Sequence, residues 1–163
     1  KLSNGEKLPT LEKYLKQGKK SKQVKLIVEI KPAKTPELED EMVAKTLKMI
    51  RNKSLENQCE FISFSLHLCK EIKSQNPKAI VQYLAGDLSP LEIKNAGIDG
   101  LDYHYSVFLD KHPDWILEAK KLGLITNVWT VNDEVIFKKL ADLGVGFVTT
   151  NEPDAFEIVY CKF

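Results

Sequence analysis

The chain has 163 residues, of which 43% are apolar and 29% charged, and its 24 Lys and Arg against 23 Asp and Glu leave a formal net charge of +1. This composition is typical of one soluble globular domain and excludes a disordered chain, and no apolar run approaches the roughly 18 to 20 residues that a membrane span requires. Lysines are frequent in residues 1–31, but without interleaved aromatic residues they predict a solvated surface rather than a nucleic-acid groove.

Short apolar runs alternate with longer amphipathic stretches along the chain. A helix is expected first, over residues 10–17. Strands are then expected at 24–30, 59–64, 79–84, 100–103, 126–131 and 146–150. Helices are expected to follow them at 36–52, 66–74, 90–96, 113–122, 133–143 and 153–160. Prolines in the first turn and glycines at the ends support several of these helix boundaries.

Six strands, each followed by a helix, predict a parallel sheet in a single α/β domain over residues 1–163. One form of such a sheet is open, doubly wound and binds nucleotides. Neither Gly-x-Gly-x-x-Gly nor Gly-x-x-x-x-Gly-Lys-Ser/Thr occurs, so the sequence has no glycine-rich loop that cradles phosphates. The nucleotide interpretation therefore lacks a mechanism.

The first expected strand carries a carboxylate and an ammonium group near its end. Side chains alternate along a strand, so Glu29 and Lys31 point to the same face. A carboxylate on an apolar, sheet-buried strand needs a partner. One interpretation is an ion pair between these two residues at the end of the strand. The other is a ligand for a hard cation next to a phosphate-binding lysine, at the carboxyl end of the sheet.

Five motifs, taken together, resemble a known family. They are Leu-Pro-Thr-Leu-Glu at 8–12, Val-Glu-Ile-Lys at 28–31, Ile-Ser-Phe at 62–64, Val-Trp-Thr-Val-Asn at 128–132 and Gly-Val-Gly-Phe-Val-Thr-Thr-Asn-Glu-Pro at 144–153. In this order they resemble the later motifs of the glycerophosphodiester phosphodiesterase family. The resemblance implies a (β/α)8 barrel of the TIM type. It also implies hydrolysis of glycerophosphodiesters to glycerol 3-phosphate and an alcohol, with a divalent cation, Ca²⁺ or Mg²⁺.

The resemblance begins after the family's opening motifs. The family's barrel starts with a strand that ends in His-Arg, and its second strand carries Glu-x-Asp; no strand with either motif precedes residues 28–31 here. We therefore expect an incomplete barrel, the carboxyl-terminal part, with about six of the eight βα units and without the first two strands. Exposed edges of such a sheet favour self-association.

The family's catalytic groups are largely among the absent motifs. Two histidines act there as general acid and base or nucleophile, an arginine binds the phosphate, and the cation is held by three carboxylates. Only the last of these, Glu29, is matched here. A single carboxylate cannot hold Ca²⁺ or Mg²⁺, which take six or more oxygens. The chain alone is thus expected to be inactive, and hydrolysis is assigned to the intact parent protein with the missing amino-terminal barrel segment.

The resemblance also assigns substrate contacts. Lys31 would neutralise charge on the phosphate, and Trp129 would offer an apolar wall to the glycerol carbons or, alternatively, pack inside the barrel. Ser63, Gln82 and His104 fall near strand ends and are further candidates for facing the site, although satisfied polar side chains are the alternative for the first two.

The remaining histidines and the cysteines are expected to be structural. His67 lies at a helix start and His112 in a turn, so both are expected at the surface. The cysteines are Cys59, Cys69 and Cys161, an odd number without metal-ligand spacing, and they are expected to be small buried hydrophobic residues.

Two other functions stay open at the level of the sequence. One is a non-catalytic binding or interaction module that keeps the barrel's later strands and a phosphate-binding Lys31. The other is an unrelated open α/β domain with its own small-molecule site. The sequence opens without a signal-peptide pattern and does not indicate a compartment.

Overall fold

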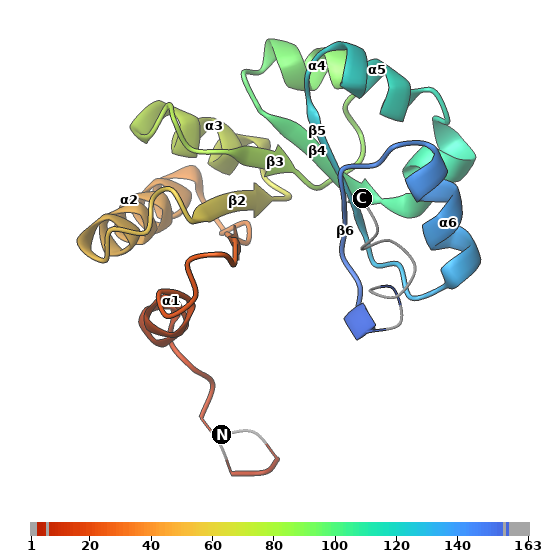
Figure 1. Cartoon of the computed structure of the whole chain (residues 1–163). Coiled ribbons are helices and arrows are strands. Elements are labelled where there is room, and N and C mark those ends of the chain that lie inside the picture. The colour runs from red at the N-terminus through yellow and green to blue at the C-terminus, as the bar shows by residue number, and fades with distance from the viewer. Residues whose placement is uncertain (1–2, 6, 155, 157–163) are drawn as a thin grey trace.

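The computed structural model describes residues 3–5, 7–154 and 156 (Figure 1). Its helices are α1 (Leu11–Gly18), α2 (Pro36–Asn52), α3 (Leu66–Gln75), α4 (Pro90–Asn95), α5 (Trp115–Lys121) and α6 (Glu134–Asp142), with one π-helix, η1 (Val107–Lys111). Its strands are β1 (Leu26–Glu29), β2 (Cys59–Ser63), β3 (Val81–Tyr83), β4 (Gly100–His104), β5 (Ile125–Trp129) and β6 (Phe147–Val148).

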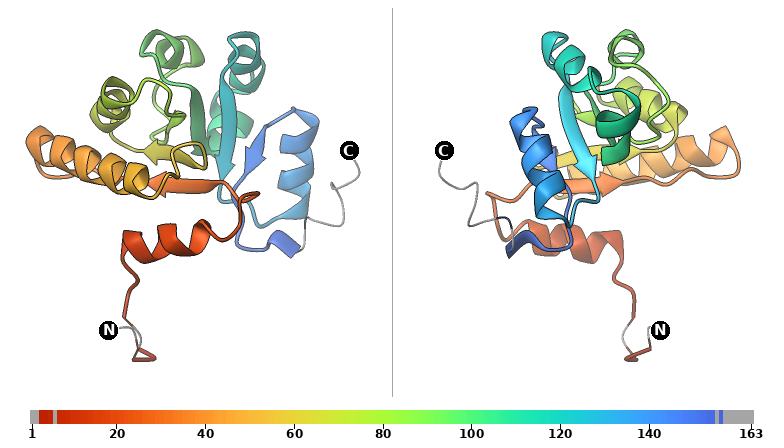
Figure 2. Two further views of the ribbon diagram at one scale, coloured as in Figure 1. Left: turned by 60° about the vertical axis from the view of Figure 1, so that its left-hand side comes forward. Right: turned by 90° about the vertical axis from the view of Figure 1, so that its right-hand side faces the viewer.

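The strands form one parallel sheet in the order β1-β2-β3-β4-β5-β6. The sheet curves, and helices α2 to α6 are arranged in an arc around it (Figure 2). This is the architecture of a (β/α)8 barrel in incomplete form, because six parallel strands curve without closing. Among the described residues, β1 and β6 are the two edges of the sheet.

The two faces of the sheet carry different residues. Alternate residues of each strand pack against the helices, where they are buried; they include Val28, Phe61, Val81, Leu101 and Val128. The residues that alternate with them point to the opposite side, which we call the concave face. It corresponds to the interior of a barrel.

Local chemistry explains where the helices begin. The side chains of Thr10, Thr35, Ser65, Ser89 and Asp133 each accept a hydrogen bond from a backbone N–H in the first turn of the helix that follows. The helices that follow these caps begin close to where the sequence predicts them. The strands also lie near their predicted positions, although most are shorter than expected.

Two segments differ from the prediction or lie beyond it. The π-helix η1 was not expected, and α5 starts at Trp115, two residues later than the expected start at 113. Most of the helix expected over 153–160 lies outside the described residues, as does Cys161. Cys59 and Cys69 are buried free thiols, as expected.

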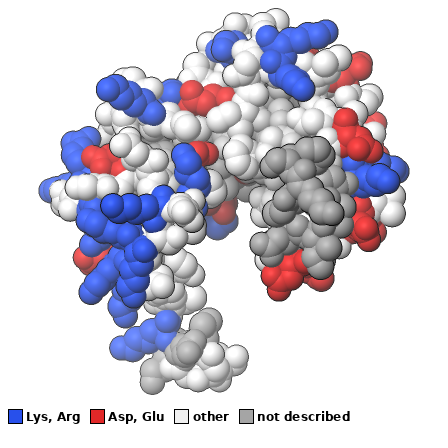
Figure 3. Space-filling view, viewed as in Figure 1, with Lys and Arg blue, Asp and Glu red and all other residues white. Residues whose placement is uncertain are grey.

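The surface shows the uneven distribution of charge along the chain. Lysine and arginine side chains gather on the side of the molecule formed by α1 and α2 (Figure 3). The lysines between α1 and β1 are exposed, in agreement with a solvated surface. None of the helices in the described part of the chain combines the length and the apolar character needed to cross a membrane.

Candidate active site at the carboxyl ends of the strands

A cavity of about 280 Å³ opens on the concave face. It is lined by Glu29, Lys31, Ile62, Phe64, Leu84, Asp102, Trp129, Thr130 and Thr149. Nearly all of these residues are in the last part of a strand or directly after it. The carboxyl end of a barrel is where barrel enzymes build their sites, so this cavity is the candidate active site.

Glu29 and Lys31 form an ion pair at the rim of the cavity. Lys31 Nζ donates to Glu29 Oε1 at 2.7 Å, and the two side chains are 76% and 33% exposed. Glu29 thus has the partner that the sequence requires, but it is not buried, because the concave face next to β1 is open. Such an exposed pair contributes little to stability. Both side chains also line the cavity, so a ligand bound there can contact them.

A ring of hydrogen bonds holds the segment that carries Lys31. On one side, Ser63 Oγ donates to the carbonyl of Ile30 at 2.6 Å. On the other, the backbone N–H of Ala33 donates to Glu39 Oε1 at 3.1 Å.

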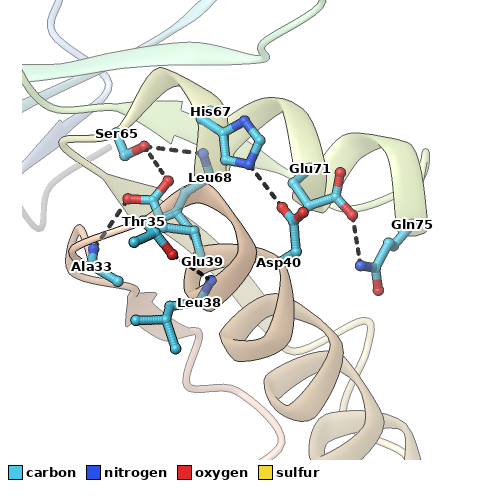
Figure 4. A network of polar contacts seen from close by, with 10 residues as sticks. All are labelled: Ala33, Thr35, Leu38, Glu39, Asp40, Ser65, His67, Leu68, Glu71 and Gln75. Carbon is cyan, nitrogen blue, oxygen red and sulfur yellow. Dashed lines mark hydrogen bonds and ion pairs between the residues drawn. The ribbon is translucent and has the colours of Figure 1, made fainter.

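The same network ties this segment to the next strand-helix connection. Ser65 Oγ donates to Glu39 Oε2 at 2.8 Å and accepts from the N–H of Leu68, which caps α3 (Figure 4). The backbone N–H of Ser65 donates to Ser63 Oγ at 3.1 Å, which closes the ring. Glu39, which sequence reasoning did not single out, is therefore a positioning residue for the backbone on both sides of Lys31.

The prediction that Ser63 faces the site is wrong. Its neighbour Ile62 lines the cavity, and alternation along β2 turns Ser63 toward the helices, where it is fully buried. Its hydroxyl donates to Ile30 and accepts from the N–H of Ser65. The alternative of a satisfied structural hydroxyl is the one that the structure supports.

Trp129 forms a wall of the cavity and packs at the same time. Its indole N–H donates to the carbonyl of Asp102 at 2.9 Å, which fixes the ring. The ring meets Phe64 edge to face at a centroid distance of 5.8 Å and His104 at 5.2 Å. The two interpretations of Trp129 therefore describe one arrangement, a packed ring that presents an apolar surface to the cavity.

Gln82 lies on the concave face, two residues before the cavity residue Leu84, which directly follows β3. It is in register with Ile62, a cavity residue, and it is 1% exposed. Its Oε1 accepts no hydrogen bond from any described residue. The alternative of a fully satisfied polar side chain therefore does not hold for Gln82.

Asp102 is a cavity residue that sequence reasoning missed, and Asn127 lies beside it on the next strand. They are paired in register on β4 and β5, both on the concave face, and both are buried. Burial, and then the negative charge of Glu29, raise the pKa of Asp102 to about 7. The sequence offered one signal for them. Asp102 and Asn127 lie two residues before the candidates His104 and Trp129, and residues i and i+2 of a strand point to the same face.

The histidines differ in their distance from the cavity. His104 contacts Trp129 and Tyr105, and its Nδ1 lies 2.8 Å from Ser106 Oγ, but it is not among the described residues that line the cavity. His67 is at the surface, with Nε2 2.7 Å from Asp40 Oδ1. The exposed His112 stacks on Trp115. The last two are surface residues, as predicted.

The described residues bring few metal-binding side chains together. They contain no group of three or more His, Cys, Asp or Glu side chains placed to hold a metal ion. Among the described residues, Glu29 and Asp102 are the carboxylates that line the cavity.

The comparisons with known proteins agree with this architecture. The glycerophosphoryl diester phosphodiesterase family matches residues 1–155, so the chain belongs to that family. No curated protein matches the chain.

Solved structures of similar proteins carry the same fold. A glycerophosphodiester phosphodiesterase from Parabacteroides distasonis is 44% identical, with a TM-score of 0.93 over 96% of this chain and 66% of that one. A Silicibacter pomeroyi protein assigned to the glycerophosphoryl diester phosphodiesterases is 27% identical, with a TM-score of 0.78 over 87% of this chain and 52% of that one.

A phosphodiesterase from Oleispira antarctica, solved with the product sn-glycerol-3-phosphate, shares the fold at 22% identity. Its TM-score is 0.78 over 92% of this chain and 60% of that one. The chain therefore spans between about half and two thirds of the length of these structures.

Proposed function

We propose that the intact parent protein of this chain hydrolyses glycerophosphodiesters to glycerol 3-phosphate and an alcohol. Membership of the glycerophosphoryl diester phosphodiesterase family carries this proposal. The cavity supports it, because a lysine ammonium group at the rim stands beside an apolar wall of Phe64, Leu84 and Trp129. A distant relative with this fold holds glycerol 3-phosphate, the product that we propose.

The described residues have separate tasks in this reaction. Lys31 would bind a non-bridging phosphate oxygen and offset the negative charge that builds up in the transition state. The apolar wall would pack against the glycerol carbons and exclude water from that side. Glu39 and Ser63 would keep the Lys31 backbone in place, so that its ammonium group meets the phosphate without reordering the loop.

We further propose that residues 1–163 alone bind the ligand but do not hydrolyse it. Hydrolysis of a phosphodiester needs a group that protonates the leaving oxygen. The two histidines that the resemblance assigns to the family's acid–base chemistry belong to motifs that residues 1–163 do not contain. The same observation favours the second candidate function, a binding module for phosphate esters.

Release of glycerol 3-phosphate from glycerophosphocholine tests the enzymatic function. The assay uses the intact parent protein and compares it with its Lys31→Met variant and with Lys34→Met, which removes an exposed lysine from the same loop. We expect Lys31→Met to lower kcat/KM by about 100-fold, since a charge-assisted contact to the phosphate is lost, and Lys34→Met to change it little. Binding of glycerol 3-phosphate without any turnover would support the binding module instead.

The cation requirement is tested in the same assay. We propose that Glu29 is one ligand of a Ca²⁺ or Mg²⁺ ion. Activity should then disappear after chelation, return with one of these ions, and be lost in Glu29→Gln, which keeps the size of the side chain and removes its charge. Full activity of Glu29→Gln in the presence of a chelator would contradict the assignment.

A further inference from the structure

One stretch of the chain carries lysines without any acidic residue. Residues 13–25 hold six lysines and neither Asp nor Glu, while the rest of the chain has five more acidic than basic residues. The six are exposed: Lys13, Lys16, Lys19, Lys20, Lys22 and Lys25. The small net charge therefore hides a basic segment on a mildly acidic molecule. Charge that is separated in this way orients a protein as it approaches a charged surface.

Most of these ammonium groups have no partner. Lys25 Nζ pairs with Glu60 Oε1 at 2.9 Å, and Lys19 Nζ donates to the backbone carbonyl of Lys53 at 2.7 Å. Within the described part of the chain, the other four side chains make no ion pair or hydrogen bond: Lys13, Lys16, Lys20 and Lys22. Their charge is thus available to an external anion.

The connection between α1 and β1 holds its lysines in a defined shape. The side-chain amide of Gln58 donates from Nε2 to the carbonyls of Gly18, Ser21 and Val24, at 3.1, 2.7 and 2.7 Å. The carbonyls therefore turn toward Gln58, while the lysine side chains between them are exposed. A connection that is ordered before binding loses little conformational entropy when it meets a partner.

A hollow of about 310 Å³ lies in this surface. Its lining includes three lysines and three side-chain amides: Lys19, Lys22, Lys25, Gln23, Asn57 and Gln58. Ammonium and amide N–H groups are hydrogen-bond donors, and they suit the oxygen atoms of a phosphate group. We call the exposed lysines of residues 16–25, together with this hollow, the basic face.

The basic face is at the end of the sheet opposite to the cavity. Residues 19–25 directly precede β1 and residues 53–58 directly precede β2, so both connections lie at the amino ends of parallel strands. The cavity lies at the carboxyl ends. Lysine and arginine side chains gather on this side of the molecule, around α1 and α2 (Figure 3). A partner on the basic face would leave the cavity open.

The composition of the basic face fits an anionic phospholipid surface better than a nucleic acid. Proteins bind single strands largely by stacking bases on aromatic side chains, and they read duplexes commonly through arginine. Residues 16–25 contain no aromatic residue, histidine or arginine. Clusters of roughly 4 to 8 basic residues are typical of segments that bind anionic lipids. The half-exposed Val24 among the lysines can enter the headgroup region.

We propose that the basic face docks the protein on membranes that contain anionic phospholipids. Docking in this orientation turns the cavity toward the aqueous phase. A glycerophosphodiester has no acyl chains, so it reaches the cavity from water. The docking itself does not depend on the proposed function, since it takes nothing from the chemistry of the cavity.

Sedimentation with vesicles tests the docking on the intact parent protein. One set of vesicles is phosphatidylcholine with about one third phosphatidylglycerol, and the other is phosphatidylcholine alone. We expect binding to the anionic vesicles only. Lys16→Gln, Lys20→Gln and Lys22→Gln combined should weaken this binding at least about tenfold, because three unpaired charges are lost. Release of glycerol 3-phosphate from glycerophosphocholine in solution should not change in this triple variant.

Two controls keep the result interpretable. Lys111→Gln, Lys121→Gln and Lys138→Gln combined remove the same charge from exposed positions on other elements and should leave vesicle binding unchanged. The unaltered protein provides a measurement that needs no variant. Its affinity for the anionic vesicles should fall at least about tenfold between about 0.05 M and about 0.5 M NaCl, since salt screens exposed charges.

Several outcomes would overturn the proposal. Equal binding to both kinds of vesicle, or binding that salt does not weaken, would exclude attraction by charge. Equal weakening in the two triple variants would show that overall charge acts and not the basic face. Binding to single-stranded DNA without binding to anionic vesicles would assign the face to nucleic acid. Loss of hydrolysis in every sample, with vesicle binding intact, would contradict the proposed function alone.

Discussion

Asp102 shows how one residue's surroundings set its chemistry. Its side chain is 1% exposed, and its Oδ1 receives no hydrogen bond from the described residues. Burial disfavours the charged form of the carboxylate, and the negative charge of Glu29 disfavours it further, so both raise its pKa. The folded protein therefore holds the proton of this carboxyl to a much higher pH than an unfolded chain does.

Stability should depend on pH through this residue. The pKa of Asp102 rises from an ordinary value of 3.8 to about 7 on folding, so the folded state binds the proton more tightly. The free energy of unfolding should then fall as the pH rises from about 4 to about 7, by at most about 4 kcal/mol. Urea unfolding at several pH values across this range measures the free energy of unfolding. In Asp102→Asn this free energy should decrease clearly less between about pH 4 and about pH 7. An identical fall in that variant would contradict the assignment.

At the level of elements, α2 does more than cover the sheet. Its cap residue Thr35 fixes where the helix begins, and one turn later Glu39 turns back to the connection between β1 and α2. Through Ser65 the same carboxylate reaches the start of α3. Two adjacent βα units are thus joined at the end of the sheet where Lys31 meets the cavity.

Removal of this connection should loosen the Lys31 segment. Glu39→Ala leaves the N–H of Ala33 and the hydroxyl of Ser65 without their acceptor, so we expect a loss of about 1 to 3 kcal/mol in stability. In the intact parent protein we also expect weaker substrate binding, seen as a higher KM for glycerophosphocholine with a smaller change in kcat.

A conservative substitution of Glu39 distinguishes a positioning role from a general loss of stability. Glu39→Gln keeps an oxygen for Ala33 and should restore most of the binding. Glu41→Ala removes an exposed carboxylate of the same helix that pairs with Lys45 and is a matched control. A KM that is unchanged in Glu39→Ala would exclude the positioning role.

At the scale of the whole molecule, the sheet leaves apolar surface uncovered. On its two edge strands, Ile27 is 48% and Phe147 is 56% exposed. Both belong to the concave face by alternation with Val28 and Val148. In a closed barrel such positions pack inside, and in an open sheet they favour association through unpaired edges.

A chain of residues 1–163 by itself should therefore self-associate. Sedimentation velocity should show a mass that rises with concentration. Ile27→Lys should weaken this association, because it places a charge on an edge strand. Leu117→Lys, an equally exposed position on α5, should not change it. A monomer at every concentration would argue against accessible edges.

The sequence predicts the order of elements well, and the reason is local. Helix caps such as Thr35 and Ser89 act within one turn, and alternation of apolar residues shows which strands are buried. The placement of Glu29 and Lys31 on one face follows from the same short-range geometry. The π-helix after β4 has no comparable signal, because its form depends on how Val107 and Phe108 pack into the core.

The site depended on longer-range relations. Ser63 and Gln82 both lie near strand ends, but the register between β2 and β3 sends one toward the helices and the other toward the concave face. Glu39 meets Ala33 and Ser65 only after α2 has folded back, and Asp102 lies beside Asn127 because two strands pair. Local residue patterns are enough to predict the helices, the strands and the Glu29–Lys31 pair at the end of β1. The neighbours of a buried polar side chain come from distant parts of the chain, so sheet register and packing decide which polar groups share the cavity.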